Sequence, residues 1–92
     1  MAAVEMYSTA LCPYCQRARR LLERKGVEYR EIRVDLEPRH REEMEHRSGR
    51  TSVPQVFIDG ASVGGFEDMV ELDLDGELDR LLGLESELEQ KS

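Results

Sequence analysis

Apolar and polar residues recur along the first part of the chain with two different spacings. Residues 2–7 alternate, with Val4 and Met6 on one side, which predicts a short strand. Residues 13–25 carry their apolar side chains at helical spacing, and they predict a helix that begins at a proline and ends at Gly26. A proline suits the first helical turn because the amide hydrogen that it lacks would have no partner there.

The next two elements differ in how much apolar surface they offer. Residues 27–36 alternate apolar and charged side chains, which predicts a second strand with one buried face and an irregularity near Arg30. Residues 38–48 are nearly all polar, and Met44 is their only large apolar side chain. We therefore expect a second helix with a thin buried stripe, weakly attached and ended by Gly49. The buried face of the strand would consist of Val27, Tyr29, Ile32, Val34 and Leu36.

The last part of the chain predicts a hairpin followed by helix. Residues 53–60 form a dense apolar strand that closes on an Asp-Gly pair, a strong turn signal leading into a short strand over residues 61–65. Apolar residues at helical spacing over 66–84, interrupted by Gly76, predict one or two helices. Residues 85–92 offer almost no core side chain, and we expect a frayed helical extension there.

The order of these elements predicts the fold class. A strand, a helix and a strand form a βαβ unit, whose strands are parallel and whose crossover is right-handed. The hairpin adds antiparallel strands, so we expect an α/β fold with a small four-stranded mixed sheet and helices on both faces. A chain of 92 residues suffices for one core. We expect one domain over residues 1–83, followed by an acidic tail over residues 84–92.

Charge is distributed unevenly, which changes the expected partners. The net charge is −7, yet residues 1–50 have a balance of +2 and residues 51–92 a balance of −9. A basic end that contains both cysteines favours a small anion or a thiolate there, and the acidic remainder argues against binding to nucleic acid or to a membrane surface. No stretch approaches the roughly 18 to 20 apolar residues that cross a bilayer. The N-terminus lacks a secretory pattern, so we expect a cytoplasmic protein with reduced thiols.

The two cysteines, Cys12 and Cys15, are the candidate reactive groups. Only a thiolate attacks a disulfide, so a redox cysteine needs a lowered pKa. If Pro13 is the first helical residue, Cys12 is the N-cap, where free backbone N–H groups and the helix dipole stabilise a negative sulfur. We expect Cys12 to be the exposed cysteine. Cys15 would lie one turn inward and less exposed, close enough to form a disulfide with Cys12. Positive charge nearby would come from Arg17, Arg19 and Arg20.

Two other interpretations of the cysteine pair explain less of the sequence. A structural disulfide closing so short a loop would add little stability and would not persist in a reducing compartment. A zinc site would need His40 and His46 as further ligands, but a predicted strand and a 24-residue gap separate them from Cys15. Both histidines fit better as surface residues of a polar helix, and we expect no metal.

Three motifs in this order and spacing resemble one family. They are "CPYC" at 12–15, "TSVPQVFIDG" at 51–60 and "GGFED" at 64–68, and together they are similar to the dithiol glutaredoxins, above all the small bacterial ones. The similarity runs from about Val4 to Leu82. It implies a thioredoxin fold, glutathione as co-substrate, and reduction of protein disulfides and protein-glutathione mixed disulfides.

The resemblance also implies a role for individual residues. Cys12 resembles the nucleophile and Cys15 the resolving thiol, with Pro13 and Arg17 in support. Val53 and Pro54 resemble a cis-proline loop, where a cis bond would turn the N–H and C=O of Val53 toward an extended peptide such as glutathione. The implied glutathione-binding residues are Tyr14, Ser52, Val53, Pro54, Gly65, Glu67 and Asp68. Among them, the N–H of Glu67 and the carboxylate of Asp68 would bind the γ-glutamyl carboxylate and ammonium.

The chain departs from the family pattern at three positions. Thr9 stands where many relatives have lysine, Leu11 where they have threonine, and Phe66 where they have a third cysteine. The missing lysine removes a cation near the thiolate and the glycine carboxylate of glutathione. We hypothesise that an arginine partly replaces it, and the candidates are Arg17, Arg39 and Arg50.

Other functions remain open at this point. A redoxin that depends on thioredoxin reductase has a similar size but usually other residues inside its C-x-x-C. An iron-sulfur binding or delivery module usually has a single active-site cysteine followed by small residues, unlike Pro13 and Tyr14 here. The expected partners are glutathione and disulfide-containing or glutathionylated proteins, for example a ribonucleotide reductase, and we expect a monomer.

Overall fold

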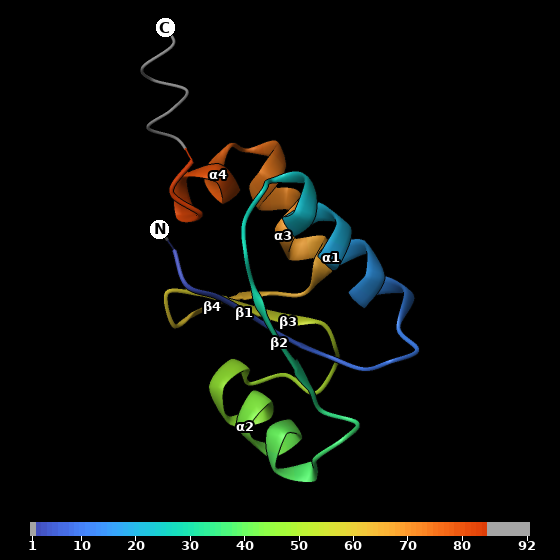
Figure 1. Cartoon of the computed structure of the whole chain (residues 1–92). Coiled ribbons are helices and arrows are strands. Elements are labelled where there is room, and N and C mark those ends of the chain that lie inside the picture. Colours follow the sequence, from blue (N-terminus) through green and yellow to red (C-terminus); the bar gives the residue numbers. More distant parts are fainter. Residues whose placement is uncertain (1, 85–92) are drawn as a thin grey trace, which may run out of the picture.

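The computed structural model describes residues 2–84, and they form one mixed sheet with helices on both faces (Figure 1). The elements follow the order that the sequence predicts, with a hairpin after the second helix and helix at the end. The elements are β1 (Val4–Ser8), α1 (Pro13–Arg24), β2 (Arg30–Arg33), α2 (Pro38–Ser48), β3 (Gln55–Ile58), β4 (Ala61–Gly64), α3 (Phe66–Leu74) and α4 (Glu77–Leu81).

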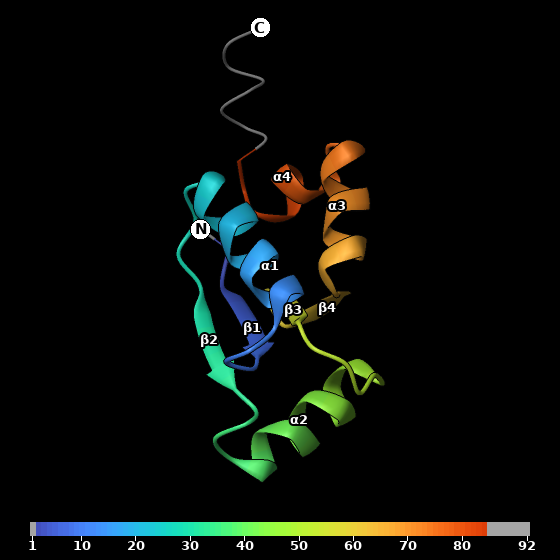
Figure 2. The same ribbon diagram turned by 90° about the vertical axis from the view of Figure 1, so that its right-hand side faces the viewer.

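The sheet has the strand order β2-β1-β3-β4. β1 pairs with β2 in parallel and with β3 antiparallel, and β3 and β4 form an antiparallel hairpin. Helices α1, α3 and α4 lie on one face of the sheet, and α2 is the only helix of residues 2–84 on the other, as Figures 1 and 2 show. The predicted βαβ unit, the hairpin and the four-stranded mixed sheet are therefore confirmed.

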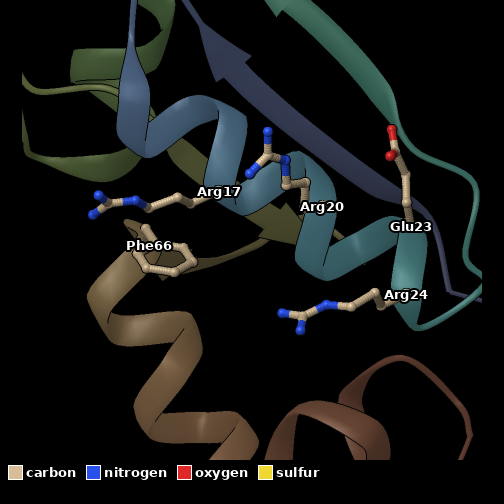
Figure 3. Close-up of a pocket in the computed structure, with 5 residues that line it drawn as sticks. All are labelled: Arg17, Arg20, Glu23, Arg24 and Phe66. Carbon is tan, nitrogen blue, oxygen red and sulfur yellow. The ribbon is translucent and has the colours of Figure 1, made fainter.

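The larger hydrophobic cluster lies between the sheet and the α1 side. Ala18, Leu21 and Leu22 form the inner stripe of α1, as the helical spacing predicts, and they are almost completely buried. Phe66, at the start of α3, faces α1 near Arg17 (Figure 3). The cluster also contains Val4, Met6, Val56, Ile58, Met69, Leu78 and Leu82. This packing fixes α1, and with it the cysteine pair, against the centre of the sheet.

A smaller cluster closes the opposite face of the sheet under α2. Met44 is the only buried residue of α2, which confirms the thin stripe. It packs with Tyr7 and Phe57, whose rings meet edge to face with centroids 5.6 Å apart. The Arg47 guanidinium lies 4.0 Å from the Phe57 ring centroid and donates to the Tyr7 hydroxyl at 2.8 Å. An arginine from α2 therefore completes this cluster where α2 has no second apolar residue.

The turns agree with the glycine signals in the sequence. Asp59 and Gly60 have φ values of 53° and 83°, the left-handed backbone that a two-residue type I′ turn requires between β3 and β4. The Asp59 carboxylate also accepts a hydrogen bond from the Ala3 N–H at 2.8 Å. Gly76, with φ of 79°, separates α3 from α4, so the predicted helical region is two helices.

The predicted second strand is wrong in its length and in one buried residue. Only residues 30–33 pair as β2, and Val27 and Tyr29 instead pack against the larger cluster, on the side of the sheet opposite to Ile32. Leu36 is 69% exposed because the chain turns toward α2 after the strand. Leu84, the last described residue, packs against the larger cluster. The predicted extension over residues 85–92 lies outside the described residues.

Candidate active site

Cys12 is the N-cap of α1, as the position of Pro13 predicts. Its backbone is extended, with φ of −139°, while its carbonyl accepts the first helical hydrogen bond from the Gln16 N–H at 3.0 Å. The Cys15 N–H donates to Cys12 Sγ at 3.1 Å. The Cys12 sulfur therefore pairs with an amide at the helix N-terminus that would otherwise have no partner.

Both cysteines are free, and Cys12 is more enclosed than the sequence suggests. Cys15 is 0% exposed, as expected of the inner cysteine, but Cys12 is only 8% exposed, so the prediction of an exposed nucleophile is wrong. The cause is the loop that follows α2, because Cys12 Sγ lies 3.9 Å from the Val53 carbonyl oxygen. Burial, and secondly the hydrogen bond with Cys12, raises the pKa of Cys15 to about 12.

The Val53-Pro54 peptide bond is cis, which confirms the predicted loop geometry. The loop is tied at two points, where Gln55 Nε2 donates to the Ser52 carbonyl at 3.0 Å and Arg41 Nη1 donates to the Thr51 carbonyl at 2.9 Å. Among the described residues, the Val53 N–H has no backbone partner. An extended peptide lying beside the cysteine sulfur could accept a hydrogen bond from it.

Glycines bring the start of α3 close to this loop. A Cβ on Gly65 would lie 3.2 Å from the Pro54 carbonyl oxygen, so a side chain there would push the two segments apart. Gly64 has a φ of 96°, and a Cβ on it would overlap the Asp68 carboxylate. That carboxylate accepts the Gly65 N–H at 2.9 Å and an N–H of Arg50 at 2.7 Å. The hydrogen bond from Gly65, followed by Arg50, holds the pKa of Asp68 below its ordinary value.

One cavity of about 270 Å³ joins these segments. All seven residues to which the resemblance assigns glutathione binding line it: Tyr14, Ser52, Val53, Pro54, Gly65, Glu67 and Asp68. Arg50, Gln55 and Phe66 line it too. The last two were not predicted as site residues, although the departure from the family pattern at position 66 was a signal for Phe66. Of the arginines considered as replacements for the missing lysine, only Arg50 lines the cavity.

The other two candidate arginines have different partners. Arg39 pairs with Glu37 at 2.7 Å, beside the start of α2. Arg17 lies over the ring of Tyr14, with its guanidinium carbon 5.2 Å from the ring centroid. The Tyr14 ring in turn meets the Phe66 ring, with centroids 6.4 Å apart. The Tyr14 ring therefore lies between Arg17 of α1 and Phe66 of α3, at the rim of the cavity.

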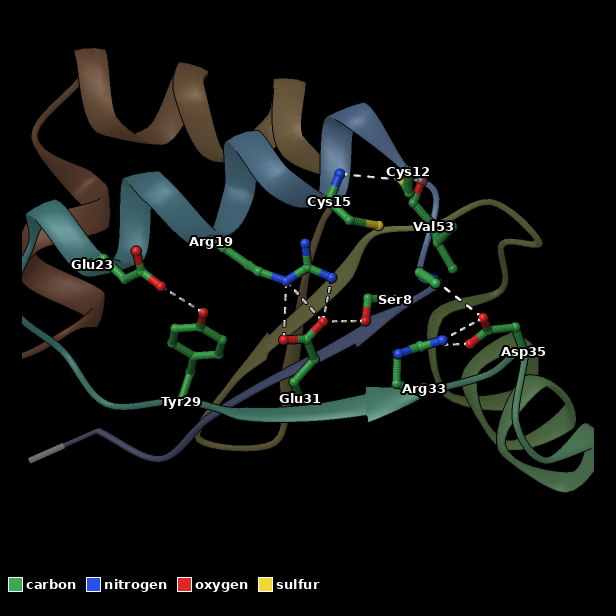
Figure 4. Close-up of polar contacts among 11 residues, drawn as sticks. Ser8, Cys12, Cys15, Arg19, Glu23, Tyr29, Glu31, Arg33, Asp35 and Val53 are labelled. Atoms are coloured by element: carbon green, nitrogen blue, oxygen red, sulfur yellow. Dashed lines mark hydrogen bonds and ion pairs between the residues drawn. The ribbon is translucent and has the colours of Figure 1, made fainter.

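A charged group lies beneath Cys15 on the sheet side of α1 (Figure 4). Arg19 Nε donates to both carboxylate oxygens of Glu31, at 3.0 and 2.8 Å, and the Ser8 hydroxyl donates to the same carboxylate at 2.6 Å. The hydrogen bond from Arg19 lowers the pKa of Glu31. The positive charge of Arg19 also lowers the pKa of Cys15, although burial outweighs it. Glu31, which the sequence did not single out, fixes this arginine.

The structure does not assemble the ligands that the zinc interpretation requires. His40 and His46 lie on α2, across the sheet from the cysteines on α1. In the part of the chain that the structure describes, no three His, Cys, Asp or Glu side chains gather closely enough to hold a metal ion. Within residues 2–84, no helix is both long and apolar enough to span a membrane.

The fold and the site define a class of protein. One thiol caps a helix and accepts an amide hydrogen bond there, and a second thiol within one turn can form a disulfide with it. The cis-proline loop beside the first sulfur offers main-chain pairing to a peptide. This combination is that of a thiol-disulfide oxidoreductase with the thioredoxin fold.

Sequence comparison identifies the family within that class. The glutaredoxin family model matches residues 4–63. The chain is 52% identical over 82 residues to Glutaredoxin 3 of Escherichia coli (strain K12), which covers 89% of this chain and 99% of the relative. It is 48% identical over 82 residues to a glutaredoxin of Pseudomonas aeruginosa, covering 89% of this chain and 98% of the relative. The chain therefore belongs to the glutaredoxin family, whose members are glutathione-dependent oxidoreductases.

Solved structures agree with this result. The solution structure of a glutaredoxin from Brucella melitensis has a TM-score of 0.81 and 46% identity, and the match covers 91% of each chain. The crystal structure of a buckwheat glutaredoxin-glutathione complex has a TM-score of 0.83 and 29% identity, covering 89% of this chain and 77% of that one. The predicted thioredoxin fold is confirmed.

Proposed function

We propose that Cys12 is the attacking sulfur and Cys15 the resolving thiol of this glutaredoxin. The Cys12 thiolate attacks one sulfur of a disulfide, a new S–S bond forms, and the other sulfur leaves as a thiolate that takes up a proton. Cys15 then attacks Cys12 in the mixed disulfide, which forms the Cys12-Cys15 disulfide and releases the second thiol. Where the mixed disulfide is with glutathione, a second glutathione thiolate can instead attack the glutathione sulfur, which gives glutathione disulfide and frees the Cys12 thiolate. Two molecules of glutathione reduce the resulting Cys12-Cys15 disulfide and leave as glutathione disulfide. The hydrogen bond from the Cys15 N–H to Cys12 Sγ is the observation that carries this assignment.

The cavity beside Cys12 is the proposed glutathione site. The cysteinyl unit of glutathione would pair with the Val53 backbone, and Ser52 and Pro54 would complete that wall. The γ-glutamyl carboxylate would meet the Glu67 N–H at the start of α3, beside Gly65, with its ammonium on the Asp68 carboxylate. The volume of about 270 Å³ and the cis loop at its edge support this placement.

Cationic and aromatic side chains at the rim complete the proposed site. Arg50 already pairs with Asp68, and it would turn toward a carboxylate of glutathione once the ammonium takes its place. Tyr14 would flank the bound tripeptide. Pro13 would support the site by fixing the start of α1, and Arg17 by holding Tyr14 through the contact of its guanidinium with the ring.

The proposed substrates are disulfide-containing and glutathionylated proteins, with a ribonucleotide reductase among the candidates. A relative from E. coli with 52% identity is named Glutaredoxin 3, which supports the proposed reduction of disulfides. We propose a cytoplasmic monomer in which residues 1–83 are the glutaredoxin domain and residues 84–92 an acidic tail. Size-exclusion chromatography with light scattering tests the monomer, and a dimer mass would contradict it.

A glutathione-coupled reduction assay tests the mechanism. The wild type should reduce both a small glutathionylated thiol and a protein disulfide, and Cys12→Ser should reduce neither. Cys15→Ser should still reduce the small glutathionylated thiol, because glutathione can release Cys12 from its mixed disulfide with glutathione. It should lose most of its reduction of the protein disulfide, which requires Cys15. Full retention of both activities by Cys15→Ser would contradict the role of Cys15. Reduction by thioredoxin reductase in place of glutathione would contradict the proposed electron donor.

A further inference from the structure

A second hollow lies beside the cysteine site, between the outer face of α1 and the start of α3. Its volume is about 550 Å³, and it is lined by Arg17, Arg20, Glu23 and Arg24 of α1 and by Phe66 of α3 (Figure 3). The positions of the three arginines differ by three and four residues, which places them on one face of the helix. We call this hollow the arginine groove.

The three arginines of the groove lack the partners that other cations of this protein have. Most cationic side chains of the described residues lie within 4.0 Å of a carboxylate. Arg17, Arg20 and Arg24 do not, nor does Arg41, which lies outside the groove and donates to the Thr51 carbonyl. All three are exposed, in a chain with 20 acidic residues and a net charge of −7. An unneutralised row of guanidinium groups on an acidic protein concentrates positive potential in one place.

The acidic residue that lines the groove does not neutralise these arginines. The Glu23 carboxylate accepts a hydrogen bond from the Tyr29 hydroxyl at 3.1 Å. Figure 4 shows this pair on the side of α1 that faces the sheet, and Figure 3 shows Glu23 directed away from Arg24. The guanidinium groups are therefore open to an anionic ligand from outside.

The groove begins at the reactive site. Arg17 contacts the Tyr14 ring, which meets Phe66, so these side chains form the wall between the groove and the cavity beside Cys12. At about 1.5 Å per helical residue, Arg24 lies about 18 Å along the helix axis from Cys12. An extended chain of about six residues covers that distance at about 3.3 Å per residue. A polypeptide bound at the cysteine therefore reaches every arginine of the groove.

We propose that the arginine groove docks an acidic, extended segment of the protein substrate, with its carboxylates within about six residues of the cysteine that is reduced. This proposal rests on the proposed function and adds the class of protein substrate. Arginine suits the task because its planar fork binds carboxylates with two parallel hydrogen bonds. Phe66 supplies an apolar floor for the side chains between the acidic ones.

Two matched peptide substrates test the proposal. Each carries one glutathionylated cysteine, followed at alternate positions by glutamate in one peptide and by glutamine in the other, and glutathionylated free cysteine is the small control. The full-length variant Arg20→Gln/Arg24→Gln is compared with Arg30→Gln/Arg80→Gln, which makes the same change in charge outside the groove. The readout is kcat/KM in the glutathione-coupled assay at about 0.02 and about 0.5 M salt.

We expect the wild type to prefer the acidic peptide at low salt. The groove variant should lose about three- to tenfold in kcat/KM for that peptide alone, since two exposed ion pairs are removed. High salt should abolish the preference, and the control variant should keep it. Equal losses on both peptides, or an equal loss in the control variant, would overturn the proposal.

Two further outcomes separate this proposal from its alternatives. If the groove variant gains activity on the acidic peptide, the arginines hold an acidic segment of this chain itself, and docking of substrate is wrong. If the protein reduces the small control but shows no preference between the two peptides, the docking proposal is wrong and the proposed function is unaffected. Inactivity on all three substrates contradicts the proposed function, and the docking surface with it.

Discussion

The pKa of Cys15 allows a prediction of how its reactivity depends on pH. Burial is the main cause that raises this pKa from an ordinary value of 9.0 to about 12. At pH 9 an ordinary thiol of that kind is about half ionised, whereas a thiol with a pKa near 12 is ionised in about one molecule in a thousand. The alkylation rate of Cys15 should therefore rise about tenfold per pH unit beyond pH 9 instead of levelling off.

The measurement uses Cys12→Ser, in which Cys15 is the remaining thiol of the chain and its burial is retained. The rate of alkylation by iodoacetamide is followed from about pH 7 to about pH 11 beside free cysteine as the reference. The ultraviolet absorbance of the thiolate is recorded over the same range, and the absorbance of the three tyrosines is subtracted with a Cys12→Ser/Cys15→Ser variant. Circular dichroism at each pH verifies that the protein remains folded.

The shape of the profile separates ionisation from access. If Cys15 reacted slowly only because reagent cannot reach it, its rate would be low but would level off near pH 9, as for free cysteine. Such a plateau in the folded protein would refute the reasoning. A continued rise, with thiolate absorbance appearing only above about pH 10, would support it.

Three further predictions concern groups around the site. Arg19→Met should lower the free energy of unfolding in urea by about 1–3 kcal/mol, because the half-buried Glu31 carboxylate then keeps only the Ser8 hydroxyl as a donor. An unchanged midpoint of urea unfolding would contradict this prediction. Gly65→Ala should raise KM for glutathione several-fold in steady-state assays, because its Cβ would lie 3.2 Å from the Pro54 carbonyl, and an unaltered KM would count against the proposed site. Because the pKa of Asp68 is lowered in the folded protein, its ionised carboxylate stabilises the fold at pH values above the ordinary pKa of 3.8. This stabilisation is lost as the pH falls through the lower pKa of the folded protein. In thermal melts Asp68→Asn should therefore be less stable than the wild type at neutral pH and equal to it at the acid end, whereas a constant difference would be inconsistent with titration of Asp68.

The order of elements and the geometry of the cysteine helix were predictable because their signals are local. Pro13 marks the helix start, which fixes Cys12 as the N-cap and Cys15 one turn inward, and the structure confirms both positions. The Asp-Gly turn and the break at Gly76 are also local, since each depends on the backbone freedom of one or two residues.

Features that depend on distant contacts were not predictable in the same way. The enclosure of Cys12 comes from Val53, which is 41 positions away in the chain. The alternation over residues 27–36 suggested one strand with one buried face and an irregularity near Arg30, but Tyr29 packs on one side of the sheet and Ile32 on the other. A pattern along the sequence indicates which residues are buried, but it does not indicate which of two clusters each joins. The pairing of Arg50 with Asp68 is another such contact.

The two faces of the sheet have separate consequences for the two halves of the site. Leu21 and Leu22 anchor the sulfur-bearing helix in the larger cluster, whereas Val53 packs on the smaller cluster that Met44 and Phe57 form under α2. A cavity-creating substitution under α2 therefore perturbs how peptide is held, while one behind α1 perturbs the reacting sulfurs. The Val53 wall of the cavity and the helix that bears the sulfurs thus rest on different hydrophobic cores, whereas α3, which carries the opposite wall, packs on the same core as α1.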